Sequence, residues 1–116
     1  MSMKDYMTIN NYSGLGTIGI SRTAIAAIAS GALKEVGGAS IFGRHPRRAG
    51  YSIPDGVKVI IGKNGRAAIH MDITLSRGVE NVPKACEKIQ ETVATAVTLM
   101  CDMVPFDVQV KVMRIV

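Results

Sequence analysis

The stretch from Asn81 to Val104 constrains the fold most, because its apolar residues recur with the period of an α-helix. They are Val82, Ala85, Cys86, Ile89, Val93, Ala96, Val97, Met100 and Val104. Pro83 suits the first turn of such a helix, where a missing N–H costs nothing, and Pro105 would end it. An apolar helix face of this length has to be covered. We expect the strands that precede and follow the helix in the sequence to pack against it.

Residues 57–75 are predicted to form a β-hairpin, since apolar and other residues alternate on both arms. Cross-strand partners share a face, so a two-residue turn would bury His70 and Asp72, which is costly. A three-residue turn, residues 63–65, leaves both outside and requires a positive φ at Gly65. This register pairs Ile61 with Ala67, Val59 with Ile69 and Val57 with Met71.

The remaining elements are predicted from local signals. We expect a strand at 16–20, a helix from Arg22 to Val36 capped by Ser21, and a last strand at 106–116. Gly37-Gly38 would supply the left-handed stop of the first helix, and Gly31 within it indicates either a close helix contact or a tolerated cost. Residues 39–42 are either a short strand or a packed turn.

These elements predict an α+β fold in the order β-α-β-β-α-β, with two helices packed on one face of a small three- to four-stranded sheet. Strands 67–75 and 106–115 should be parallel, and we expect strand 57–61 between them, antiparallel to both. With 116 residues, the chain reads as one domain, residues 14–116, after a flexible segment, residues 1–13.

The formal net charge of +5 is concentrated between residues 44 and 66, which hold six basic residues and one acidic residue. A local basic surface suggests an anionic partner, and the alternative is a solvated loop that aids solubility. The candidate contact residues are Arg44, Arg47, Arg48, Lys63 and Arg66.

The segment Gly62-Lys63-Asn64-Gly65 matches the GxxG loop of nucleic-acid-binding KH domains. In a KH domain this loop joins two helices, whereas residues 67–75 repeat with a period of two. We therefore interpret it as a hairpin turn. A basic hairpin tip and basic loop that contact nucleic acid in another way remain the alternative function.

No catalytic constellation is visible, so we expect no enzyme, no cofactor and no metal site. His70 and Asp72 share a face of the hairpin without an evident nucleophile. Cys86 and Cys101 would lie about 22 Å apart along one helix, which is too far for a disulfide. Two distant thiols also provide too few ligands for a metal. Both are interpreted as core residues in a reducing compartment.

Three apolar residues, Ile60, Met113 and Ile115, are predicted on the outer face of the sheet, where they would form an interface or be ordinary scattered surface residues. No apolar run approaches the roughly 20 residues that a membrane span needs, and no signal peptide or lipidation motif is evident. We expect a cytoplasmic protein without direct membrane insertion, associated with a membrane only through a partner.

Five groups of residues form a recognisable combination: Gly16–Ser21 leading into Ala24–Ala29, Glu35–Gly38, Gly56–Val59, Gly78–Pro83 followed by Ile89–Val93, and Val108–Val112. In these residues the chain resembles the alkaline shock protein family of bacterial envelope stress response proteins. The resemblance covers residues 14–116, and residues 37–56 alone depart from the family pattern by being longer and more basic.

This resemblance implies a non-catalytic scaffold or interaction protein linked to alkaline and cell-envelope stress. It implies self-association into homo-oligomers and a protein partner, a small membrane-anchored protein in some members. It carries across no active-site residues.

Overall fold

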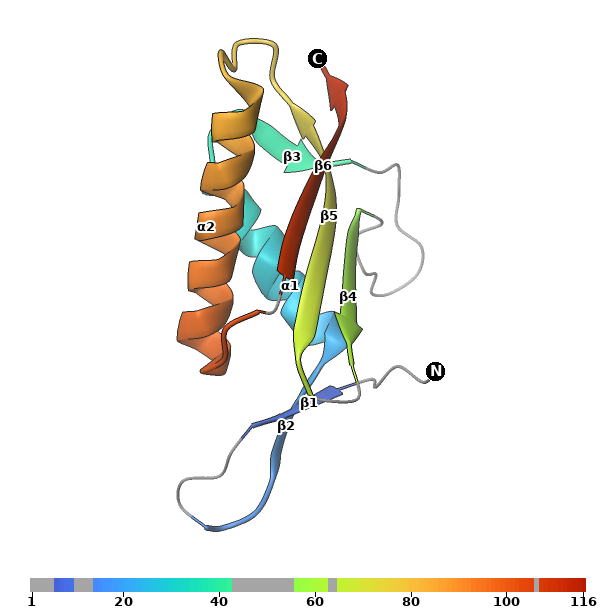
Figure 1. The fold of residues 1–116 in the computed structure, drawn as a ribbon, viewed down its shortest axis with the longest axis vertical. Helices are drawn as coiled ribbons and strands as arrows, with labels where there is room; N and C mark the ends of the chain where they lie inside the picture. The colour runs from blue at the N-terminus through green and yellow to red at the C-terminus, as the bar shows by residue number, and fades with distance from the viewer. Residues whose placement is uncertain (1–5, 10–13, 43–55, 63–64, 106) are drawn as a thin grey trace.

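The strand β5 (Ala67–Leu75) is hydrogen bonded to every other strand of the main sheet in the computed structural model of the chain (Figure 1). β3 (Ala39–Ile41) and β4 (Val57–Ile61) run antiparallel to β5 along one side, and β6 (Asp107–Ile115) runs parallel along the other. The structure describes all residues except 1–5, 10–13, 43–55, 63–64 and 106.

A second, two-stranded sheet projects from one end of the molecule (Figure 1). It pairs β1 (Tyr6–Ile9) with β2 (Ile18–Ser21), which contains most of the strand predicted at 16–20. β1 was not predicted, because it lies within residues 1–13, which were expected to be flexible. For the other residues of that segment, flexibility remains a prediction. Of the two alternatives predicted for residues 39–42, a short strand or a packed turn, the strand is confirmed, because β3 pairs with β5.

The predicted register of the β4–β5 hairpin is confirmed in all three apolar pairs. Gly65 has a φ of 81°, as the three-residue turn requires. The N–H of Gly65 donates to the carbonyl of Gly62 at 3.0 Å, and the N–H of Gly62 donates to the carbonyl of Arg66 at 2.9 Å. Because an extended strand follows it, this GxxG segment is a hairpin turn and not a KH loop.

The two helices, α1 (Arg22–Leu33) and α2 (Val82–Cys101), lie on the same face of the sheet, which confirms the α+β class. α1 packs against β4, α2 packs against β6, and the helices contact each other. Along β5 every second residue is buried under them, while the residues between point to the uncovered face and are half-buried. The buried residues of β5 are Ala67, Ile69, Met71, Ile73 and Leu75.

Both helices begin where the sequence predicts. The hydroxyl of Ser21 accepts from the N–H of Ala24 at 3.1 Å, and the side-chain oxygen of Asn81 accepts from the N–H of Lys84 at 3.0 Å. α1 ends three residues before Val36, because residues 34–36 continue as tighter turns with N–H groups bonded to carbonyls three residues back.

The predicted end of α2 is wrong. Asp102 adopts a left-handed conformation with a φ of 56° and stops the helix before Pro105 is reached. The buried residues of α2 are Ile89, Val93, Val97 and Cys101, which recur every four residues. An α-helix has 3.6 residues per turn, so the buried face shifts gradually around the helix axis. Met100 and Val104, predicted in the buried stripe, are therefore exposed.

The predicted strand order is also wrong in one respect, since β5 and not β4 occupies the centre of the sheet. β6 is parallel to β5 as predicted, but its register shifts after Ile73, so that Thr74 faces Arg114 and Met113 is an extra residue in β6. Such a bulge reverses the alternation of side chains. Ile115 consequently lies in register with buried Leu75, on the opposite face from its predicted position.

The outer edge of β6 is contacted by α2. The side-chain amide of Gln90 donates to the carbonyl of Val108 at 2.9 Å, so this edge carbonyl has a partner from its own chain.

Gly56 lies where β3 and β4 meet along the same side of β5. The N–H of Phe42 donates to the carbonyl of Asp72 at 2.9 Å, and the N–H of Asp72 donates to the carbonyl of Gly56 at 2.7 Å. A Cβ atom on Gly56 would lie 2.5 Å from the carbonyl oxygen of Phe42 and 2.7 Å from that of Asp72. Both neighbours are backbone atoms, so a side chain here would push the strands apart.

We predict that Gly56→Ala lowers the free energy of unfolding by about 2 kcal/mol, because backbone must shift to admit the methyl group. The control is Gly31→Ala, because nothing lies within 4 Å of the Cβ position of Gly31. Of the two predictions for this glycine, the close helix contact is therefore wrong. That variant should raise stability by about 0.5–1 kcal/mol through helix propensity. Urea denaturation measures both, and equal effects of the two changes would contradict the argument.

Candidate functional site

The uncovered face of the main sheet carries polar side chains in rows that cross its strands. In one row, Lys58 of β4, His70 of β5 and Gln109 of β6 are successive partners. In the next row, Asp72 of β5 lies beside Lys111 of β6. Directly opposed side chains in a sheet start about 5 Å apart, so these five polar groups share a small area of a rigid surface.

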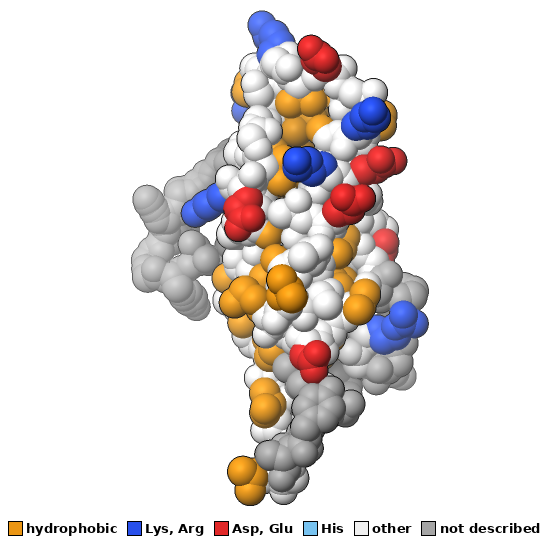
Figure 2. Space-filling model, turned by 90° about the vertical axis from the view of Figure 1, so that its left-hand side faces the viewer, with side chains coloured by type: hydrophobic (Ala, Val, Ile, Leu, Met, Phe, Trp, Pro, Cys, Tyr) orange, Lys and Arg blue, Asp and Glu red, His pale blue; other side chains and the backbone are white. Residues whose placement is uncertain are grey.

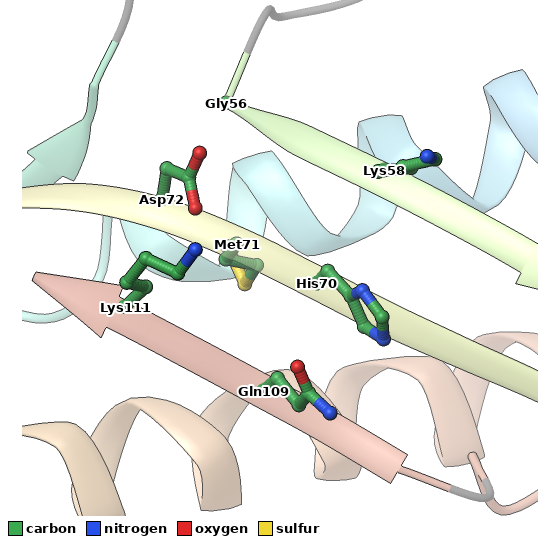
Figure 3. A pocket seen from close by; sticks show the side chains of 7 residues that line it. All are labelled: Gly56, Lys58, His70, Met71, Asp72, Gln109 and Lys111. Carbon is green, nitrogen blue, oxygen red and sulfur yellow. The ribbon is translucent and has the colours of Figure 1, made fainter. Parts of the chain in front are cut away.

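These five residues line a shallow hollow of about 260 Å³, together with Gly56 and Met71 (Figure 3). Figure 3 shows Asp72 beside Lys111 at one end and His70 beside Gln109 further along the strands. Gly56 lies at this end of the hollow, where its carbonyl accepts from the N–H of Asp72.

The lining can bind a polar group, and its described residues include no serine, threonine or cysteine. His70 and Asp72 do share this face, as predicted. Among the described residues, no three His, Cys, Asp or Glu side chains are grouped so that they could hold a metal ion. The arrangement is therefore suited to charge recognition.

Of the five predicted contact residues, the structure describes one, and that residue does not line the hollow. Arg66 is described and exposed beside the β4–β5 turn, away from the lining. The other four, Arg44, Arg47, Arg48 and Lys63, lie outside the described residues.

The three residues of the predicted interface are not on one surface. Ile60 is half-buried on the uncovered face, in the same row as Ala68 and Asp107. Met113 is the exposed bulge residue, and Ile115 lies in register with the opposite, helix-covered face.

Sequence reasoning missed a second feature, an exposed apolar surface that we call the apolar stripe. At the C-terminal end of α2 and just beyond it, Leu99, Met100 and Val104 are 79%, 69% and 73% exposed. On the β1–β2 hairpin, Leu15 is 91% and Ile18 is 54% exposed. Figure 2 shows hydrophobic side chains from the lower part of this face down to the projecting end, whereas charged side chains gather in its upper part.

The two cysteines lie on α2, one half-buried and one buried. Burial raises the pKa of both thiols above their ordinary value of 9.0. A thiol with a higher pKa in the folded chain stabilises the fold fully below the unfolded pKa and loses that contribution as the pH rises through 9 towards the folded value.

We predict that the stability difference between the wild type and Cys101→Ala narrows as the pH rises from about 7.5 to about 10.5, because only the wild type loses this thiol contribution. Urea denaturation across this range measures the difference. Ser30→Ala, a small change without a titrating thiol, is the control and should keep a constant difference. A constant difference for Cys101→Ala would contradict the prediction.

No helix among the described residues combines the length and the hydrophobicity that crossing a membrane requires. No curated protein and no solved structure matches the chain. One family model does match, over residues 10–116. The matched range contains both helices and every strand of the two sheets except β1. The chain therefore belongs to the alkaline shock protein 23 family, a family of cell envelope-related function.

Proposed function

We propose that this protein is a non-catalytic scaffold that acts in the cell envelope stress response through self-association and contacts with protein partners. The observation that carries the proposal is the apolar stripe. Large aliphatic side chains that are more than half exposed and gathered on one side of a small domain are typical of interaction surfaces.

The geometry of α2 supports this role. Its N-terminal part is fixed by the Asn81 cap and by burial of Ile89 and Val93, so the helix is a rigid element. Its C-terminal part presents Leu99 and Met100 outward, because Val97 and Cys101 are the residues that face the core. These outward residues can be buried by a partner without any change in the fold.

Family membership gives the proposed cellular setting. We place the protein in the cytoplasm, where a small membrane-anchored partner would hold it at the envelope, as the family resemblance implies. The nucleic-acid alternative rests on cations of which the structure describes Arg66 alone.

We predict that Leu99→Ser combined with Met100→Ser weakens self-association about tenfold or more, because truncating central apolar contacts removes most of the binding energy of an interface. Sedimentation velocity over a concentration series measures the effect. Both side chains are exposed, so the unfolding midpoint should stay close to that of the wild type.

The matched control is Glu87→Ser combined with Lys88→Ser, two exposed changes on the same helix in its charged part. It should associate like the wild type. A wild type that stays monomeric and co-purifies with no protein from native extract would overturn the proposal. Co-purification of nucleic acid, confirmed by a salt-dependent mobility shift, would favour the alternative.

A further inference from the structure

We propose that the hollow on the uncovered face of the sheet binds a phosphate group, held by Lys58, His70 and Lys111. The proposal is independent of the apolar stripe, since no residue of the stripe lines the hollow.

The donors reach the hollow from three strands whose register is fixed. Lys58 and Lys111 lie on β4 and β6, on opposite sides of β5, and His70 lies between these strands on β5 itself. A group seated over His70 would therefore be approached by one ammonium group from each side. Pairing of the three strands holds the Cα atoms of these residues in place, so only side-chain ends have to order on binding.

The charge of the lining favours an anion. Its described residues include two lysines and one carboxylate, Asp72, so their net charge is positive without counting His70. A second carboxylate on this face, Asp107, accepts a hydrogen bond from the side-chain amide of Gln109 at 3.0 Å and does not line the hollow. Lysine suits phosphate as a compact point charge, and histidine adds a directional N–H donor.

A ligand anion has to compete with the carboxylate of Asp72 for the ammonium group of Lys111. Asp72 lies beside Lys111 in the same row, so a ligand has to attract that ammonium group more strongly than a neighbouring carboxylate does. A phosphate monoester carries about −1.5 to −2 charges near neutral pH and three acceptor oxygens, whereas a carboxylate ligand carries a single charge. The hollow should therefore prefer phosphate to acetate.

The test is a titration of the full chain with inorganic phosphate, followed by the backbone amide NMR signals of Lys58, His70 and Lys111. We expect saturable shifts at these residues, and weaker binding of acetate. Lys58→Gln and Lys111→Gln should each weaken phosphate binding about fivefold, whereas Asp72→Asn should tighten it by a similar factor, as expected for exposed charge pairs.

Lys84→Gln is the control, because this lysine is exposed in the first turn of α2 and does not line the hollow. It should bind phosphate like the wild type. Absence of saturable shifts would overturn the proposal. Equal weakening by Lys84→Gln would also overturn it, because that result shows attraction by net charge without a site.

Two further probes distinguish the source of the phosphate group. Glycerol 3-phosphate represents a soluble ester, and vesicles that contain phosphatidic acid represent a lipid headgroup, with phosphatidylcholine vesicles as the blank. Binding of either probe, lost in Lys111→Gln, supports the hollow and identifies its source, and binding of neither overturns it. Variants of the hollow should leave self-association unchanged, so failure here is distinguishable from failure of the proposed scaffold role.

Discussion

Backbone hydrogen bonding by β5 on both of its sides is the interaction on which the rest of the structure depends. β3 and β4 share one side of this strand and β6 takes the other, so each would lose its place without it. The shared side is continuous because Gly56 lets the ends of β3 and β4 approach each other at Asp72. Burial of alternate β5 residues then places both helices on one face, and the polar rows are left on the other.

This division separates two surfaces of different character. The apolar stripe belongs to the end of α2 and the projecting hairpin, and desolvation of aliphatic side chains would be its source of binding energy. The hollow belongs to the sheet, where charge and hydrogen bonding would act. No residue is shared between the two surfaces.

The sequence predicted best those features that depend on neighbouring residues. The hairpin register followed from the cost of burying His70 and Asp72. The start of α1 followed from the Ser21 cap, and that of α2 from its apolar period and Pro83. The bulge at Met113 could not be predicted, since no glycine or other local signal marks it. The hollow was missed for a related reason: Lys58 and Lys111 line one hollow only because β5 pairs with both of their strands, which are far apart in the chain.

The bond between Gln90 and Val108 has a consequence for how copies of this protein can join. An unpaired edge strand is a template on which another chain can add a strand of its own. Here the amide of Gln90 already occupies an outward carbonyl near the start of β6, and an incoming strand would have to displace it. Addition of a strand at this end of β6 is thereby discouraged, which disfavours cross-β fibres that would grow from this part of the edge.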